Sequence, residues 1–141
     1  MNLYTIVLNS VSGELLSVAP PVLRNIQGLF ELNERVVLEG RWKFGYFSLT
    51  AVGATNVGGI NIDWEPEMKT NIVHHHDTIN DDMEQGSVDN KIYSAPQNLI
   101  TGQEIGHFSF GSSIVLLFEA PLGLKFTMKP LTRVKLGTCI L

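Results

Sequence analysis

Apolar and polar residues alternate along several short stretches of the chain. Alternation with a period of two is typical of β-strands, and the β-branched and aromatic residues in these stretches favour the same structure. Two segments after residue 98 continue the pattern and predict three or four more strands. The stretches before residue 98 are LYTIVLN (3–9), ELLSV (14–18), RVVLEG (35–40), YFSLTAV (46–52) and INIDW (60–64), and the later segments are 99–121 and 124–141.

A different period appears between residues 20 and 32. Pro20 and Pro21 suit the first turn of a helix, where a missing N–H is harmless. Apolar residues then recur at three- and four-residue spacing, which would gather them on one helical face. They are Val22, Leu23, Ile26, Leu29 and Phe30. The pattern predicts one amphipathic helix near residues 20–32, although Gly28 weakens it.

Many short strands, glycine-rich corners and a single helix predict a mainly β fold of the α+β class. We expect a small β-sandwich or a partly closed barrel of short strands. The 141 residues fit one domain with a hydrophobic core. The net charge of −4 and the lack of any Lys/Arg cluster argue against nucleic acid as a partner. No apolar run is long enough to span a membrane as a helix, and the first residues do not resemble a targeting peptide.

The segment from residue 71 to residue 98 is polar and aperiodic, which predicts a long surface loop with a short strand near KIYS (91–94). The segment contains a group of histidines and carboxylates that could bind Zn²⁺ or a similar ion. They are His74, His75, His76, Asp77, Asp81 and Asp82. Three consecutive histidines of an extended loop point in different directions, however. We interpret the segment as a solvated loop without a metal, and a metal site is the alternative.

An apolar run is interrupted by Gly111, Ser112 and Ser113 between two predicted strands. A bulge or tight turn is one explanation, since glycine adopts unusual φ angles and serine hydrogen-bonds locally. A reactive backbone bond is the other. A serine hydroxyl held against the preceding carbonyl can move the acyl group from nitrogen to oxygen, and elimination followed by hydrolysis then leaves a pyruvoyl group. Such a group stabilises a carbanion, as pyridoxal phosphate does in other enzymes.

Three other features are less specific. The stretch VGATNVGG (52–59) is typical of a glycine-rich β-corner and not of a phosphate loop, because no lysine follows it and no helix opens after it. His107 lies between apolar strand residues, which indicates a structural or half-exposed histidine and not a base. Cys139 is the single cysteine, so an internal disulfide is excluded, and we expect a small buried side chain.

Three longer motifs follow one another in a specific order. NERVVLEGRWKFGYFSLTAVGATNVGGINI (33–62) precedes a variable loop, which is followed by GQEIGHFSFGSSIVLLFEAP (102–121) and RVKLGTCI (133–140). This order resembles the C-terminal part of phosphatidylserine decarboxylase. Members of that family usually carry Leu-Gly-Ser-Thr where this chain has Phe-Gly-Ser-Ser at 110–113. The resemblance runs from Ser12 to the end, so we interpret residues 1–11 as a lead segment outside the family and 12–141 as its C-terminal domain.

The resemblance implies a self-cleaving proenzyme. The Gly111–Ser112 bond would be cut, giving a larger β-type chain of residues 1–111 and a small α-type chain of residues 112–141. Ser112 would become an N-terminal pyruvoyl group, a cofactor derived from the chain itself. Its carbonyl would form a Schiff base with the amine of phosphatidylserine, and loss of CO₂ followed by hydrolysis would release phosphatidylethanolamine.

The same resemblance implies partners and a location. The substrate is a two-chain phospholipid, so family enzymes work at a membrane surface. The two cleaved chains would stay together as a heterodimer, and a homo-oligomer is a further option because family members are often dimers. The motifs are most similar to the mitochondrial, animal-like branch, which implies a peripheral place on the mitochondrial inner membrane.

Self-cleavage in the family uses an Asp-His-Ser triad in which the histidine is the base. The Asp and His precede the segment that corresponds to GELLSV (13–18), and the opening MNLYTIVLNSV (1–11) does not carry their motif. We therefore expect this chain alone to cleave slowly or not at all. Three hypotheses stand: a phosphatidylserine decarboxylase, a truncated β-module of that family that stays uncleaved, and a protein that binds metal through His74–His76.

Overall fold

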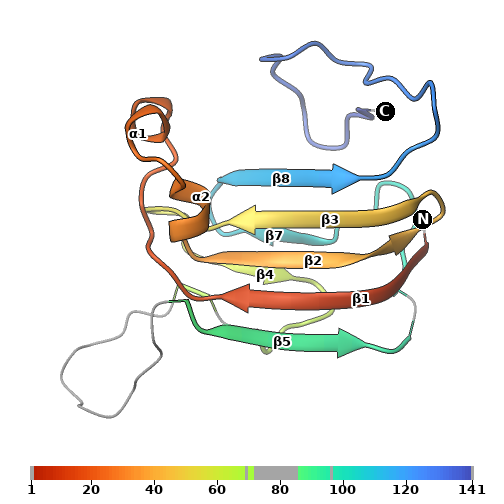
Figure 1. Ribbon diagram of the computed structural model, residues 1–141, viewed down its shortest axis with the longest axis horizontal. Helices are drawn as coiled ribbons and strands as arrows, with labels where there is room; N and C mark the ends of the chain where they lie inside the picture. The colour runs from red at the N-terminus through yellow and green to blue at the C-terminus, as the bar shows by residue number, and fades with distance from the viewer. Residues whose placement is uncertain (1, 69, 72–85, 96, 141) are drawn as a thin grey trace.

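The computed structural model describes residues 2–68, 70–71, 86–95 and 97–140, and these form two antiparallel sheets and two short helices (Figure 1). The mainly β prediction is confirmed. The small sheet consists of β4 (Ile60–Ile62) and β7 (Gly106–Phe108). The large sheet consists of β1 (Asn2–Val11), β2 (Arg35–Trp42), β3 (Gly45–Val52), β5 (Val88–Tyr93), β6 (Gln97–Asn98) and β8 (Ser113–Phe118).

The large sheet has the strand order β5-β1-β2-β3-β8, and β6 pairs with one end of β1. β2 and β3 form a hairpin in continuous register from Arg35↔Val52 to Trp42↔Gly45. β1 lies between β2 and β5, so the N-terminal strand is a central part of the sheet. β5 and β8 are the two edges of this order, and the sheet is therefore open and does not close into a barrel.

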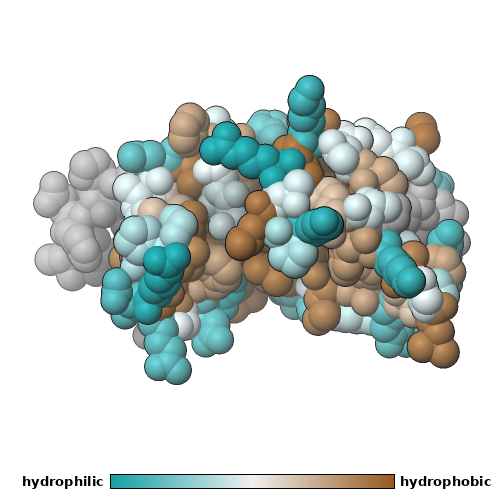
Figure 2. Space-filling view, turned by 90° about the horizontal axis from the view of Figure 1, so that it is seen from above, coloured by the Kyte–Doolittle hydropathy of each residue, from teal (hydrophilic) through white to brown (hydrophobic). Residues whose placement is uncertain are grey.

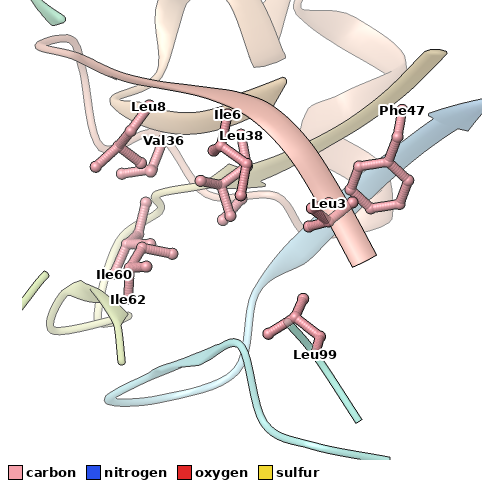
Figure 3. Close-up of a cluster of buried hydrophobic side chains, with 10 residues drawn as sticks. Leu3, Ile6, Leu8, Val36, Leu38, Phe47, Ile60, Ile62 and Leu99 are labelled. Carbon is pink, nitrogen blue, oxygen red and sulfur yellow. The ribbon is translucent and has the colours of Figure 1, made fainter. Parts of the chain in front are cut away.

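The hydrophobic core lies between the large sheet and a second layer that contains β4 (Figure 3). Val36 and Leu38 of β2 are buried and alternate with less buried neighbours, as the period of two requires. Ile60 and Ile62 of β4 are the buried residues of the second layer. The cluster is completed by Leu3, Ile6, Leu8, Phe47, Ala51 and Leu99.

The predicted single helix is wrong. The structure has two short helices, α1 (Pro20–Asn25) and α2 (Leu29–Leu32), and of these residues only Leu29 is buried. The chain leaves the helical conformation at Ile26, and Gly28 adopts the left-handed φ of +70°, which starts α2 in a new direction. In the described residues, neither helix has the length and apolarity that crossing a membrane requires.

Two predicted strands are also wrong. ELLSV contributes one isolated bridge, Glu14↔Asn33, and the described residues after Phe118 contain no strand. An alternating pattern needs a neighbouring strand to pair its backbone. Neither segment finds such a neighbour in the described part of the chain. The predicted strand near KIYS is confirmed as β5, which extends over Val88–Tyr93.

Strand β8 is the exposed edge of the large sheet. Its four central residues, which alternate between the two faces, are 58, 44, 38 and 62% exposed although all are apolar. They are Ile114, Val115, Leu116 and Leu117. The strandless segment that follows lies above β8 in Figure 1 and also exposes large apolar side chains. An apolar surface therefore surrounds the second half of the motif 102–121.

Candidate functional site

The Gly111–Ser112 bond lies between β7 and β8, directly before the first residue of β8. Ser113 pairs with Val52 at the end of β3, and this register continues without a break to Phe47↔Phe118. The β-branched and apolar residues of β8 favour this extended pairing. One side of the bond is therefore fixed by the main sheet.

The hydroxyl of Ser112 is held in one position. It donates a hydrogen bond to the carbonyl oxygen of Val52 at 2.7 Å, and the residue is half-buried. Gly111 is exposed, and a Cβ added there would meet no atom within 4 Å. The φ angle of Gly111 is not positive, so a left-handed turn does not explain this glycine. An ordered serine thus follows a glycine that has open space beside it.

The glycine-rich stretch 52–59 contacts the residues that precede the bond. The N–H of Phe110 donates to the carbonyl oxygen of Val57 at 2.7 Å, and the N–H of Ser109 donates to that of Gly59 at 3.1 Å. Gly58 has a φ of +84°, and a Cβ there would lie 2.8 Å from Cβ of Ser109, so only glycine allows this approach. The structure therefore brings this stretch beside Gly111 and Ser112.

A buried asparagine holds the backbone next to Val52, the residue that accepts the hydrogen bond of Ser112. Asn33 is 0% exposed. Its Nδ2 donates to the carbonyl oxygens of Leu16 and Gly53, both at 2.8 Å, and its Oδ1 accepts from the N–H of Leu16 at 3.0 Å. Gly53 directly follows Val52, whose carbonyl holds Ser112. The sequence contained no signal for this role, because the partners of Asn33 are 17 and 20 residues away.

The described residues place no base against Ser112. Its hydroxyl is hydrogen-bonded to Val52, and no imidazole or carboxylate in the described ranges hydrogen-bonds to it. Nδ1 of His107 instead lies 3.2 Å from Oε1 of Glu104 and 4.0 Å from Oδ1 of Asp63. A hydroxyl without a base is a weak nucleophile at neutral pH.

Two other predictions concern cysteine and the histidine loop. Cys139 is exposed, so the expected buried side chain is wrong. The reason is that Cys139 belongs to the strandless segment after β8, which contributes no residue to the buried core cluster. His74, His75, His76, Asp77, Asp81 and Asp82 lie outside the described residues.

Sequence reasoning missed a second polar cluster. Glu65 is 8% exposed and accepts hydrogen bonds from Nζ of Lys91 and the hydroxyl of Tyr93. These bonds hold the pKa of Glu65 below its ordinary value, whereas burial and the neighbouring Glu65 raise the pKa of Tyr93. A cavity of about 310 Å³ lies beside Glu65 and Lys91. Lys91 lies 26 positions after Glu65 in the sequence, and the pairing of β5 with β1 places it at this contact.

Residues 2–141 match the sequence profile of the family described as phosphatidylserine decarboxylase. The chain is 44% identical over 119 residues to the mitochondrial phosphatidylserine decarboxylase proenzyme of Caenorhabditis elegans, which covers 84% of this chain and 29% of that protein. It is 44% identical over 127 residues to the mitochondrial proenzyme 1 of Saccharomyces cerevisiae, covering 89% of this chain and 25% of that protein. It is 42% identical over 133 residues to the mitochondrial proenzyme of Pongo abelii, covering 91% and 31%.

The chain thus spans between 25 and 31% of the length of these three relatives. The profile match includes β1, which pairs with β2 and β5 in the same sheet. The domain boundary at residue 12 stays a prediction, and so does cleavage at the Gly111–Ser112 bond. The match covers more than nine tenths of the sequence and agrees with the three motifs found above. The chain belongs to the phosphatidylserine decarboxylase family.

Proposed function

We propose that this chain is the pyruvoyl-forming part of a phosphatidylserine decarboxylase, which cleaves itself at the Gly111–Ser112 bond and converts phosphatidylserine to phosphatidylethanolamine with release of CO₂. Membership of the family supports the reaction. The position of Ser112 carries the choice of residue. Its hydroxyl donates a hydrogen bond to the carbonyl oxygen of Val52. Ser112 directly precedes β8 and directly follows a glycine that has open space beside it.

Self-cleavage consumes water and releases ammonia. Oγ of Ser112 attacks the carbonyl carbon of Gly111, the C–N bond breaks, and the Ser112 nitrogen takes up the hydroxyl proton. The resulting ester loses the proton on Cα of Ser112, and Gly111 leaves as a carboxylate. The dehydroalanine that remains tautomerises to an imine, which water hydrolyses with loss of ammonia. A pyruvoyl group then stands at the N-terminus of residues 112–141.

The surrounding residues act by holding the backbone. Rigid placement of a reacting hydroxyl and carbonyl contributes up to about 7–11 kcal/mol in favourable cases. The N–H groups of Ser109 and Phe110 already donate to Gly59 and Val57, so they position the chain and do not stabilise the oxyanion. Once formed, the pyruvoyl group supplies the electron-withdrawing carbonyl that loss of CO₂ requires. The open side of Gly111 leaves space for the amine of the substrate.

The two cleavage products would remain associated. β8 belongs to the small product, and it pairs with β3 of the large product through the register from Ser113 to Phe118. Nε1 of Trp42 also donates to the carbonyl oxygen of Glu119 at 3.0 Å. The rings of Trp42 and Phe118 meet edge to face with centroids 5.7 Å apart. These contacts support a non-covalent heterodimer of residues 1–111 and 112–141.

The substrate and the membrane surface meet the chain at its exposed apolar side. Figure 2 shows the molecule of Figure 1 from above, with brown apolar residues between teal polar ones. Large exposed apolar side chains of and beyond β8 support this assignment, because a patch of this kind marks a protein or lipid contact. They include Leu117, Leu122, Phe126, Leu131 and Leu136. The names of the relatives support a mitochondrial location. A peripheral place on the inner membrane is our proposal from the family resemblance.

The rate of cleavage separates this function from its alternative. Since the described residues hold no base at Ser112, we expect cleavage to be slow. The alternative is a β-module of the family that stays uncleaved. The observation in its favour is that no imidazole or carboxylate of the described residues hydrogen-bonds to the Ser112 hydroxyl.

Trapping of the ester tests the proposal. Hydroxylamine attacks an ester carbonyl, so treatment of the chain should give a Gly111 hydroxamate and a fragment that starts with unmodified Ser112. Ser112→Ala should abolish both products. Ser113→Ala, the neighbouring serine in β8, is the matched control and should leave them unchanged. Equal fragments from all three proteins, or none from the unmodified chain after prolonged treatment, would contradict the proposal.

A further inference from the structure

Three side chains with metal-ligating atoms converge on the exposed face of the β4–β7 sheet. They are Asp63, Glu104 and His107, and one ligand atom of each lies within 4.8 Å of the other two. Nδ1 of His107 is 3.2 Å from Oε1 of Glu104 and 4.0 Å from Oδ1 of Asp63. None of the three takes part in the contacts around Ser112 described above.

Strand register creates this convergence. Asn61 pairs with His107 and Ile62 with Gly106, and the N–H of Asp63 donates to the carbonyl oxygen of Ile105 at 3.0 Å. Ile62 is buried, whereas Asn61 and Asp63 are exposed, so Asp63 lies on the same face as His107. The strands approach closely because residue 106 is a glycine: a Cβ there would lie 2.1 Å from the carbonyl oxygen of Asn61. The backbone therefore fixes two of the three ligand positions.

The three atoms suit a divalent transition ion. A tetrahedral ion bound at about 2.0–2.2 Å from each ligand holds the ligand atoms about 3.3–3.6 Å apart. The His107–Glu104 distance of 3.2 Å is close to this requirement. The exposed side chain of Asp63 has to move closer to meet it, since its Oδ1 lies 4.0 Å from Nδ1 of His107 and the three ligand atoms lie within 4.8 Å of one another. One imidazole nitrogen with two carboxylate oxygens suits Zn²⁺ and its neighbours better than Mg²⁺ or Ca²⁺, which prefer oxygen alone.

We propose that Asp63, Glu104 and His107 bind a divalent transition-metal ion of the Zn²⁺ class, with His107 coordinating through Nδ1 and water in the remaining positions. The exposure of all three groups makes this a site of modest affinity that exchanges with solvent. The proposal is independent of self-cleavage and of the histidine loop 74–76. The competing explanation is a plain ion pair between His107 and Glu104, which an exposed surface supports equally well without a metal.

Calorimetric titration with ZnCl₂ distinguishes the two explanations. The full chain is titrated with and without replacement of His74, His75 and His76 by alanine, because that loop could bind Zn²⁺ by itself. The loop variant should retain one Zn²⁺ per chain. Adding His107→Ala or Asp63→Asn to the loop variant should weaken that binding at least about tenfold. Glu67→Gln, an exposed carboxylate outside the cluster, is the matched control and should leave the affinity unchanged.

Nuclear magnetic resonance of the imidazole nitrogens locates the ion. The Nδ1 signal of His107 should shift on addition of Zn²⁺, and the shift should disappear in Asp63→Asn at the same Zn²⁺ concentration. Loss of all Zn²⁺ binding in the loop variant would overturn the proposal, and so would binding that His107→Ala leaves intact. Proper folding of each variant is checked by its circular dichroism spectrum, and Asp63→Asn and Glu104→Gln keep the shape of the side chains they replace.

Discussion

Replacement of Asn33 by alanine should destabilise the protein, because this side chain joins three parts of the backbone in the buried interior. Its amide makes three hydrogen bonds, two to Leu16 and one to the carbonyl oxygen of Gly53. Alanine removes all three and leaves the backbone groups of Leu16 and Gly53 without that partner. The backbone N–H of residue 33 caps the C-terminal end of α2 by donating to the carbonyl oxygen of Leu29, and this bond is unaffected.

The magnitude follows from these bonds. A buried hydrogen bond contributes about 0.5–1.5 kcal/mol net, so three contribute about 1.5–4.5 kcal/mol. We take about 3 kcal/mol as the expected loss, since the buried polar groups that remain have to be desolvated without their partner. With a urea m-value of about 1–3 kcal/mol/M, the unfolding midpoint should fall by about 1–3 M.

Urea unfolding followed by fluorescence of the two tryptophans measures this change. Asn25→Ala is the matched control: its Nδ2 also donates to a backbone carbonyl, that of Pro21 at 2.7 Å, but on the exposed surface. We expect the control to change stability by under about 0.5 kcal/mol. A loss in Asn33→Ala that equals the loss in the control would refute the role assigned to this buried amide.

Three further predictions test other parts of the structure. Glu65 has a lowered pKa in the folded protein, so its ionised side chain contributes its full stabilisation above the ordinary pKa of 4.5. This stabilisation disappears as the pH falls through the lower pKa of the folded state. Glu65→Gln should therefore have a different thermal unfolding temperature from the unmodified chain at pH 7 but the same one in strong acid. Gly106→Ala should cost about 2 kcal/mol or more in urea unfolding, because its Cβ would meet the carbonyl oxygen of Asn61 at 2.1 Å. Leu117→Lys should reduce sedimentation with phosphatidylserine vesicles about tenfold, whereas unchanged binding would exclude β8 as the lipid contact.

The β2–β3 hairpin could be predicted because its signal is local. Apolar residues such as Val36 and Leu38 occupy alternate positions and are buried on one face. The predicted stretches 35–40 and 46–52 fall inside the observed strands Arg35–Trp42 and Gly45–Val52. Each strand finds its partner after a short turn, so no long-range information is needed.

The helix and the last strands could not be predicted for the opposite reason. The spacing of Val22, Ile26 and Leu29 suits a helix, yet only Leu29 meets the core. Gly28 adopts a left-handed conformation, whereas helix propensity predicts only that a glycine destabilises a helix slightly. After Phe118, apolar residues alternate without a neighbouring strand in the described part of the chain. Burial, which decides both cases, depends on what the rest of the molecule places beside the segment.

The candidate site divides in the same way. Gly111 and Ser112 were identified from a motif of adjacent residues, and the structure adds the partner of the hydroxyl, Val52, which is 60 residues away. Asn33 and Glu65 carried no signal, because their roles exist only through contacts 17 to 28 residues distant. Sequence motifs thus located the candidate bond, whereas the residues that support it could be found only from the fold.

The intact mass of the purified chain after prolonged incubation tests self-cleavage most directly. We predict two species, one that ends at Gly111 with a free carboxylate and one of residues 112–141 whose N-terminus has lost its amine and carries a ketone. The ketone should react with a hydrazide, and both species should be absent from Ser112→Ala. A single full-length mass that persists throughout, or a small fragment that retains an N-terminal serine, would contradict the account.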